Sequence, residues 1–470
     1  MKSKKKMLLI LGLAAVLLLG TAAVLLGTDE SSSPENQTET SAEGQMEELV
    51  GLTAEQIDTI EITNDTGNYI ISRTDDGLMT VDAVQKYTLN QALLQSALGI
   101  LDSFSGEVIF EEAYDEEKYG LDEPAAQLKI TSGDTEKTVY LGNYNEGASA
   151  WYVKTDEADK LYSIASGFGD WFLYSPFKYV DTELIRSFNS STDELLDRLT
   201  RVKIERPNLE EPLEIVADEG EAAAYTSSYV IISPVEVRTS YQTMNSQIGG
   251  LFGLRADETV GVYKEADAAA YGMDAPAMTM TVDHDGITEV FTVGAEAEDG
   301  VRYLITSEND LLYTISELKL AFLHVTADDL FFEMALLPNI STVEQVTLEF
   351  AEERYTFDLE HGAEAKDLTV QMDERELDAN LFRKYYSFLL EIDIEKLNTE
   401  EIGTERVMAV TFQYADGTED LVEAYATEEA RRMSIYINGN ASFEGRLAYV
   451  EKAKTELEHL LNGQDIDTNW

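Results

Sequence analysis

Several short patterns in the sequence combine residues that could act in catalysis. Ser175–Lys178 and Ser316–Lys319 both place a serine three positions before a lysine, as in the serine–lysine motif of penicillin-interacting enzymes. Neither pattern has Ser-Asp-Asn or Lys-Thr-Gly companions, and Ser3–Lys6 repeats it within a basic N-terminal segment. We therefore interpret these tetrads as chance matches.

A dense acidic stretch, Glu111–Glu117, carries five carboxylates and invites comparison with glycosidases and calcium sites. The chain has 90 acidic and 34 basic residues, however, so acidic clusters arise without a specific function and usually form a solvated surface. The turns at Asp75–Gly77 and Asp283–Gly286 do not continue into a twelve-residue calcium loop that ends in glutamate. Weak calcium binding stays open as an alternative.

The remaining patterns contain no catalytic or ligand-binding constellation. The chain has no phosphate-binding P-loop and no Gly-x-Ser-x-Gly nucleophile elbow, and the lack of cysteine removes thiolate sites and disulfides. Four histidines are scattered without the spacing of a zinc motif: His284, His324, His361 and His459. Of these, His324 lies in an apolar helical pattern that predicts a core or boundary position. We predict no catalytic, cofactor-binding or metal-binding residues, and a protein that is not an enzyme.

The net charge of −56 bears on the class of partner. Nucleic-acid affinity comes mainly from Lys and Arg side chains that neutralise phosphates. An acidic surface of this kind repels a phosphate backbone, so we expect no nucleic-acid binding.

The most specific signal is a motif, Tyr-Gly-(Leu/Met)-Asp-x-Pro, that occurs twice at a distance of 152 positions. Its two copies contain Tyr119, Gly120, Asp122 and Pro124, and Tyr271, Gly272, Asp274 and Pro276. A strand-like run, a turn and a second run follow each copy, and the glycines that end the second runs, Gly142 and Gly294, are again 152 positions apart. A chain that repeats itself at this length is built from duplicated units.

Each residue of the motif has a structural explanation. The glycine can take the positive φ that ends a helix, and the aspartate can accept backbone N–H bonds in an Asx-type turn. The proline favours an extended entry into the next strand, and the tyrosine ring is expected to pack over the turn. The motif therefore predicts a joint between a helix and a strand, and a binding role for the Tyr–Asp pair is the alternative.

The motif, with the following Leu141-Gly142 turn and the Trp151–Val153 strand, resembles a bacterial family known as domain of unknown function 4340. Two copies fit, over roughly residues 50–185 and 198–330, and a third unit fits loosely. The resemblance implies an N-terminal membrane anchor, an extracytoplasmic body and an association with ABC transporters of the gliding-motility type. It implies no catalytic residues.

The N-terminus contains a candidate anchor. Four lysines within residues 1–6 precede an uninterrupted apolar run, Met7–Gly27, which as a helix would measure about 31 Å and could cross a hydrocarbon core of roughly 30 Å. The lysines predict a cytoplasmic N-terminus and an extracytoplasmic body, hence a single-pass protein of the bacterial plasma membrane. A signal peptide cleaved near Gly20–Ala22 is the alternative, although Val24–Leu26 continue the apolar run.

The rest of the chain divides into a linker and three units. Residues 28–45 are polar and are expected to form a flexible linker; repeat units follow at 46–186 and 187–336, and a divergent third unit without the motif at 337–470. Each unit begins with strand-like alternation and continues with a helical stripe. In the third unit the predicted strands are 343–350, 355–359, 368–372, 407–414, 421–425 and 433–437, and the predicted helices are 377–392 and 448–461.

These observations predict an α+β protein: tandem repeats of antiparallel sheet with helices packed on one face, preceded by a single N-terminal transmembrane helix. The expected function is that of a non-enzymatic, extracytoplasmic accessory or interaction subunit of a cell-envelope complex of the ABC-transporter type. The alternative is an envelope enzyme or binding protein that acts on wall polymer or peptide. Oligomeric state does not follow from the sequence.

Overall fold

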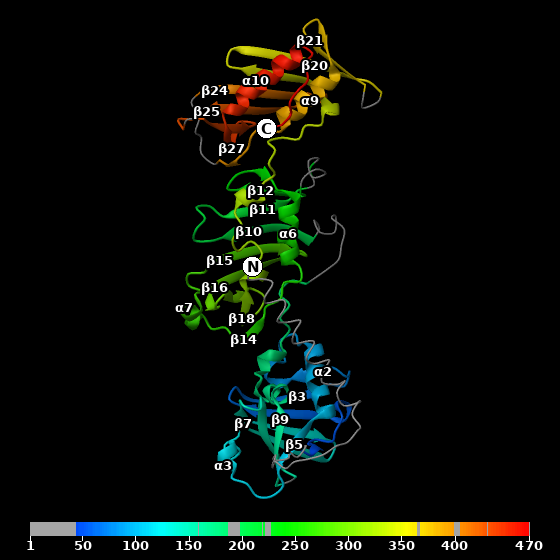
Figure 1. Ribbon diagram of the computed structural model, residues 1–470, viewed down its shortest axis with the longest axis vertical. Helices are drawn as coiled ribbons and strands as arrows, with labels where there is room; N and C mark the ends of the chain where they lie inside the picture. Colours follow the sequence, from blue (N-terminus) through cyan, green and yellow to red (C-terminus); the bar gives the residue numbers. More distant parts are fainter. Residues whose placement is uncertain are drawn as a thin grey trace, which may run out of the picture.

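Three antiparallel sheets of nine strands each follow one another along the longest axis of the molecule (Figure 1). The computed structural model describes residues 44–469 except 158, 187–197, 219, 221–226, 364–366, 399–404 and 430. The first unit contains β1–β9, the second β10–β18 and the third β19–β27. The predicted α+β class, built mainly from antiparallel sheets, is confirmed.

The strands of each unit follow one another closely in the chain. The first sheet consists of β1 (Met46–Glu48), β2 (Thr59–Asn64), β3 (Gly67–Arg73), β4 (Met79–Val81), β5 (Ser105–Phe110), β6 (Ala126–Ser132), β7 (Thr135–Asn145), β8 (Ala150–Thr155) and β9 (Leu161–Ala165). The second consists of β10 (Leu199–Glu205), β11 (Leu213–Ala217), β12 (Tyr229–Ser233), β13 (Val237–Arg238), β14 (Glu258–Val262), β15 (Met278–His284), β16 (Ile287–Glu298), β17 (Val301–Thr306) and β18 (Leu311–Ser316). The third consists of β19 (Val343–Phe350), β20 (Glu353–His361), β21 (Leu368–Met372), β22 (Arg375–Leu377), β23 (Lys396–Leu397), β24 (Glu405–Tyr414), β25 (Glu419–Ala426), β26 (Arg432–Ile437) and β27 (Asn440–Arg446).

The second and third sheets have the same strand order. It runs β13-β12-β11-β10-β15-β16-β17-β18-β14 in the second and β22-β21-β20-β19-β24-β25-β26-β27-β23 in the third. The first sheet follows the same plan with two changes: the run of neighbouring strands before its helix has three members, β2–β4, in place of four, and β1 is added at the outer edge beside β5. The third unit is therefore a topological repeat although it lacks the sequence motif.

A helix follows each half of a unit. Within the described part of the chain the α-helices are α2 (Gln91–Gly99), α3 (Glu116–Tyr119), α4 (Ser166–Gly169), α6 (Tyr241–Leu251), α7 (Ala268–Tyr271), α8 (Ala327–Leu330), α9 (Ala379–Leu390) and α10 (Ala448–Leu461). Helix α9 begins where the Asp378 carboxylate accepts hydrogen bonds from the backbone N–H groups of Asn380 and Leu381, which otherwise lack intrahelical partners. Helices α9 and α10 lie side by side over one face of the third sheet (Figure 1).

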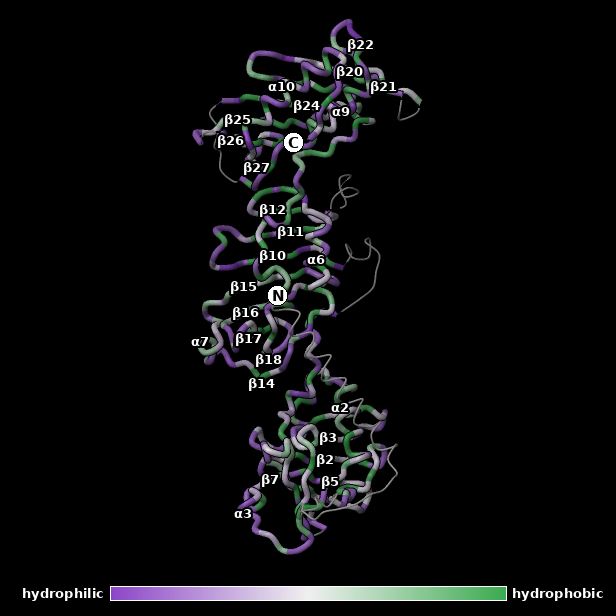
Figure 2. Tube along the Cα trace, viewed as in Figure 1, coloured by the Kyte–Doolittle hydropathy of each residue, from purple (hydrophilic) through white to green (hydrophobic). Residues whose placement is uncertain are grey.

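Alternation of side chains explains why each sheet buries one face. Along β15, Met278, Met280 and Val282 are buried, whereas the residues between them are partly exposed. Figure 2 shows hydrophobic and hydrophilic residues interleaved along the strands, while the segment around α3 is mostly hydrophilic. A two-residue period of this kind is what a half-buried strand requires.

The strand that follows the first helix of each unit lies at or next to a sheet edge, and in each unit another segment lies beside it. In the first unit β5 pairs with β1. In the second, β14 contacts the 3-10 helix η5 (Pro176–Tyr179) of the first unit, and Lys178 Nζ lies 3.0 Å from Glu258 Oε1. In the third, the Leu397 N–H of β23 donates to Asp328 of α8 at 2.8 Å. The segment that leaves one unit thus covers the edge of the next, which protects it from pairing with other chains.

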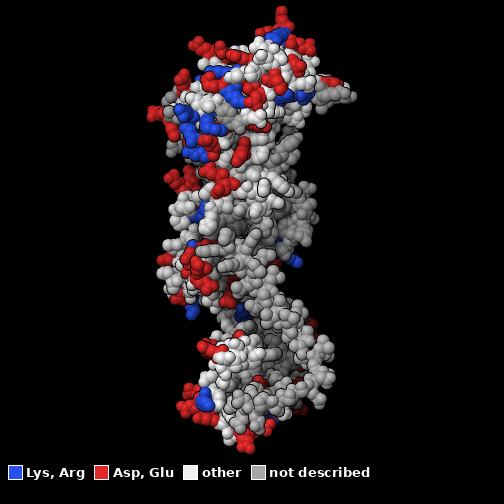
Figure 3. Space-filling view, in the orientation of Figure 1, with Lys and Arg blue, Asp and Glu red and all other residues white. Residues whose placement is uncertain are grey.

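The described part of the chain contains no helix that is long and apolar enough to cross a membrane. The predicted anchor at residues 7–27 lies outside the described residues. Figure 3 shows acidic side chains on all three parts of the visible face, with most of the basic side chains on the third.

Candidate functional site

The two copies of the signature motif form the same turn. Helix α3 ends at Gly120 with φ 68°, and α7 ends at Gly272 with φ 69°. Both glycines have the left-handed backbone conformation that the sequence predicted. Any side chain would be strained in this conformation, which explains why glycine occupies the position. The chain then enters β6 or β15 after Pro124 or Pro276, both half-buried.

The motif tyrosines pack over the turn in the same way. The rings of Tyr119 and Tyr152 lie 4.8 Å apart at 69°, and those of Tyr271 and Tyr303 lie 4.9 Å apart at 67°. Edge-to-face pairs of this kind stabilise beyond the area that they bury. The predicted packing of the motif tyrosines is therefore confirmed in both units.

The glycines that follow in β7 and β16 complete the joint. A Cβ atom built on Gly142 would overlap the carbonyl oxygen of Tyr119, and one built on Gly294 would overlap the carbonyl oxygen of Tyr271. The signature turn can lie directly on the strand only because the strand has no side chain there. This contact explains why both glycines recur at the same spacing as the motif.

The motif aspartates do not have the role that was predicted for them in an Asx-type turn. Asp122 and Asp274 are exposed, and their carboxylates accept no hydrogen bond from any residue that the structure describes. The predicted Asx-type turn is therefore wrong: the turn is held by backbone bonds instead. One of them is donated by the Leu121 N–H to the Glu116 carbonyl at 3.0 Å, and its counterpart by the Met273 N–H to the Ala268 carbonyl at 2.8 Å.

In the first unit, Asp122 lines a polar cleft of about 580 Å³. Lys154 Nζ lies 2.7 Å from Glu116 Oε2 and 5.3 Å from the centre of the Tyr140 ring. Burial raises the pKa of Tyr114, another wall residue, to about 12. The cleft therefore offers carboxylates, a paired ammonium group and a neutral phenol to a polar ligand.

The second unit does not reproduce these charges. Strand pairing places Tyr140 opposite Lys154 in the first unit and Thr292 opposite Ile305 at the equivalent site of the second. Ala268 occupies the position of the acidic residue in α3. The turn is thus common to both units, whereas the chemistry of the cleft belongs to the first.

A buried ionisable pair in the second unit escaped the sequence analysis. His284 Nε2 lies 3.3 Å from Glu289 Oε2, and Nδ1 lies 3.1 Å from Asp285 Oδ2. Hydrogen bonds to Glu289 and Asp285 raise the pKa of His284. Arg198, which donates to Asp285, lowers the pKa of that carboxyl to about 2. The sequence did contain a signal for this pair: the two-residue alternation along β15 and β16 places His284 and Glu289 on the buried face.

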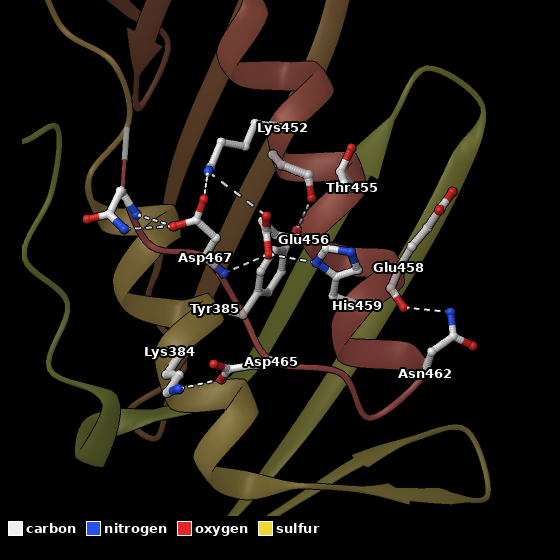
Figure 4. Close-up of polar contacts among 12 residues, drawn as sticks. Lys384, Tyr385, Lys452, Thr455, Glu456, Glu458, His459, Asn462, Asp465 and Asp467 are labelled. Carbon is white, nitrogen blue, oxygen red and sulfur yellow. Dashed lines mark hydrogen bonds and ion pairs between the residues drawn. The ribbon is translucent and has the colours of Figure 1, made fainter.

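A second cluster fastens the C-terminal tail to α10 (Figure 4). The buried Glu456 carboxylate contacts His459 Nδ1 at 3.1 Å and accepts a hydrogen bond from the Asp467 N–H at 2.9 Å. Lys452 Nζ lies 2.8 Å from the Asp467 carboxylate. Because its partners satisfy the buried charge, this cluster is explained by tail attachment.

The serine–lysine tetrads do not form catalytic pairs. Ser175 Oγ accepts a hydrogen bond from the Phe177 N–H, and Ser316 Oγ accepts one from the Leu318 N–H. Both serines therefore cap 3-10 turns, while Lys178 and Lys319 form ion pairs with other acids: Glu258 and Asp257.

The position predicted for one histidine is wrong. His324 was expected in the core or at its boundary, but 77% of its side-chain surface is exposed. The apolar residues around it belong to a turn that leaves the second unit, and not to a helix. The spacing of the apolar residues around His324 thus resembled that of an amphipathic helix, although the segment is irregular.

Comparison with protein families identifies two matching regions, residues 80–236 and 230–406, with the family described as Domain of unknown function (DUF4340). The chain belongs to this family. Two copies had been predicted from the motif. No curated protein and no solved structure matches the chain.

The two family matches are offset from the sheets. The first runs from β4 into the second unit, and the second runs from β12 to the start of β24. Each match therefore contains one complete joint between consecutive sheets.

Proposed function

We propose that this protein is a membrane-anchored, extracytoplasmic interaction subunit of a cell-envelope complex of the ABC-transporter type, and that it performs no catalysis itself. The observation that carries the proposal is that the residues of the repeated motif have a structural role. Gly120 ends the helix, the Tyr119 ring packs on Tyr152, and Gly142 of the strand lies against the Tyr119 carbonyl; the counterparts in the second unit do the same. The repeated residues thus have a structural role within the first two units, and the three similar units form a rod (Figure 1), an architecture suited to contacts along its length.

The N-terminal sequence supports an orientation for this rod. The apolar run at residues 7–27 and the polar linker at 28–45 lead directly to β1, at the outer edge of the first sheet. A linker of this length spans roughly 23 Å on average. In this proposal the first unit stands nearest the membrane and the third farthest from it.

The alternative function is an envelope enzyme or binding protein for wall polymer or peptide. The polar cleft of the first unit favours it, because carboxylates and a paired lysine could hydrogen-bond to hydroxyl or amide groups. The interaction role is preferred because the second unit keeps the turn and loses these charges.

The experiment is affinity isolation of the full chain from detergent-solubilised membranes after crosslinking in intact cells. The proposal predicts that an integral membrane protein is co-isolated in near-stoichiometric amount. Recovery of the chain alone, together with retention or cleavage of wall polymer by the purified protein, would favour the alternative. Protease added to wall-stripped cells tests the orientation, since digestion should remove everything after about residue 45.

A further inference from the structure

The β17–β18 turn, residues 307–310, attaches the second unit to the first by charge. Its Asp310 carboxylate lies 2.8 Å from Lys86 Nζ and accepts a hydrogen bond from the Tyr87 hydroxyl at 2.7 Å. The Asp310 carbonyl also accepts a hydrogen bond from the Tyr263 N–H at 2.8 Å, which places the turn at the end of β14. Since Lys86 and Tyr87 belong to the first unit, the position of this turn affects how the two units are held together.

A second attachment lies at the other end of β14, the edge strand of the second sheet. There, Lys178 Nζ of the first unit lies 3.0 Å from Glu258 Oε1. The chain that connects the units crosses at this same end, where the Ala256 N–H donates to the Thr182 carbonyl at 2.9 Å. The first unit is thus tied to the second by the main chain at one end of β14 and by side chains of the β17–β18 turn at the other.

The β17–β18 turn also lies against a buried carboxylate. The Ser307 N–H donates to the Val290 carbonyl, and the Val290 N–H donates to Ser307 Oγ, each at 2.9 Å. The preceding residue of β16, Glu289, has a side chain that is 4% exposed. Burial and the nearby Glu289 charge both raise the pKa of Glu308 in the turn. A carboxylate of the turn and a buried carboxylate of the sheet therefore repel each other at this point.

His284 compensates this buried charge. Among the residues that the structure describes, it is the one cationic group in contact with Glu289, at 3.3 Å from Nε2. Its Nδ1 lies 3.1 Å from Asp285, which also accepts a hydrogen bond from Arg198. Both ring nitrogens thus face carboxylates, and only the doubly protonated imidazolium can donate from both. The arrangement of side chains is therefore built for the charged form of the ring.

The sign of the pH dependence follows from these contacts. Hydrogen bonds to carboxylates raise the pKa of His284 above the value of about 6.5 for an unfolded chain. The stabilisation is complete below about pH 6.5 and is lost as the pH rises through the higher pKa of the folded protein. Other groups at this joint titrate at higher pH: contact with Asp310 raises the pKa of Lys86, burial raises that of Tyr87, and burial raises the pKa of Tyr313 to about 12.

We propose that the β17–β18 turn is a proton-sensitive clamp between the first two units. When His284 is protonated, it compensates the charge of Glu289 and the turn stays in contact with the first unit. When His284 loses its proton, Glu289 and Glu308 repel each other and the turn moves away from the first unit. The first unit can then rotate about the attachment at the other end of β14. The clamp does not rest on the proposed transporter partner.

The test measures single-molecule energy transfer between two pH-insensitive dyes on the full chain in detergent solution. The chain has no cysteine, so the dyes can be placed on Gln95→Cys of α2 and Ser246→Cys of α6, two exposed positions. The distribution of transfer efficiencies should be narrow at pH 6 and at least twofold wider at pH 9. A control pair, Ser246→Cys with the exposed Thr455→Cys of α10, spans the second joint and should be equal at both pH values. Equal widths for the first pair at pH 6 and pH 9, or the same broadening in the control pair, would overturn the proposal.

Two variants with opposite expected results and a matched control identify the titrating group. His284→Gln removes the cation, so the distribution should be wide at both pH values. Glu289→Gln removes the buried charge, so the distribution should be narrow at both. His324→Gln changes a histidine with a side chain that is 77% exposed and should keep the response of the parent chain. If His284→Gln does not fold, Glu289→Gln decides alone: a pH response that persists in it would contradict the clamp.

Discussion

The signature turns of the first and second units have the same backbone and different surroundings. In both, a left-handed glycine ends a short helix, a tyrosine pair covers the turn and a bare glycine lets the turn lie on the strand. Beside the first turn lie Lys154, Glu116 and Tyr140; at the equivalent positions of the second are Ile305, Ala268 and Thr292. The comparison teaches that the repeated residues specify the turn, while the residues around it are free to differ.

The largest effect is expected where the turn meets the strand. Gly142→Ala and Gly294→Ala would each drive a methyl group into a backbone carbonyl that cannot move without displacing the turn. We expect a loss of about 3 kcal/mol in each unit, at the upper end for overpacked sites. Hydrogen exchange of peptides from β6–β7 and β15–β16 measures the local loss. A large loss in only one unit would break the equivalence of the two turns.

A smaller effect should distinguish the two turns. A Cβ atom on Gly120 would meet the Asn143 side chain, which can rotate away, whereas one on Gly272 would lie 2.6 Å from the Ala295 backbone nitrogen. Gly120→Ala should cost about 1 kcal/mol for the left-handed backbone alone. Gly272→Ala should cost about 2 kcal/mol because a clash is added.

The same hydrogen-exchange peptides measure this difference, with Gly133→Ala as the control. Gly133 also has a positive φ of 55°, but a Cβ atom there would meet no atom within 4 Å. Gly133→Ala should therefore show only the backbone cost. Equal losses of local stability in Gly120→Ala and Gly272→Ala would mean that the Asn143 side chain and the Ala295 backbone move aside equally easily.

The charged wall of the first unit should contribute little to stability. Lys154→Met removes the ion pair with Glu116, whose side chain is 47% exposed. Since partly exposed pairs stabilise weakly, we expect a loss of about 1 kcal/mol or less, and smaller still at high salt. Denaturant titrations at low and high salt give the comparison. A loss several times larger would indicate that the cleft helps to hold the turn.

The smallest effect is expected for the motif aspartates. Because neither carboxylate has a hydrogen bond among the residues that the structure describes, Asp122→Asn and Asp274→Asn should change the free energy of unfolding by less than about 0.5 kcal/mol. Thermal unfolding of the full chain with each substitution tests this. A loss well above that value in either unit would show that the aspartate has a partner in solution.

Much of the fold could be predicted because long alternating strands and amphipathic helices carry a strong signal. In the third unit the predicted strand at 343–350 and helix at 448–461 match β19 and α10 in their bounds. Short edge strands such as β13 and β23 were missed, since two residues show no period. Their positions follow from pairing with β12 and β27 in the same sheets, which local sequence does not encode.

The site was predictable in part. Glycine and tyrosine roles follow from backbone sterics and ring size, so the turn was predicted correctly at Gly120 and Gly272. The Asx-type turn was not formed, because it needs the N–H group of the residue two positions after the aspartate. That residue is Pro124 or Pro276, and proline has no N–H group. Alternation along β15 and β16 indicates that His284 and Glu289 are buried, whereas their contact depends on the pairing register of the two strands, which is not visible in a single sequence.

The measurement that tests the central claim most directly is co-isolation of the membrane partner with a double variant, Asp122→Asn with Asp274→Asn. The full chain, in wild-type and variant forms, is crosslinked in cells and purified from solubilised membranes, and the co-isolated membrane protein is quantified against the chain. If the motif serves only the fold and the chain serves to hold a partner, both forms should retain the same protein in the same amount. Absence of any membrane protein with the wild type, or its loss from a variant of unchanged unfolding temperature, would contradict the account.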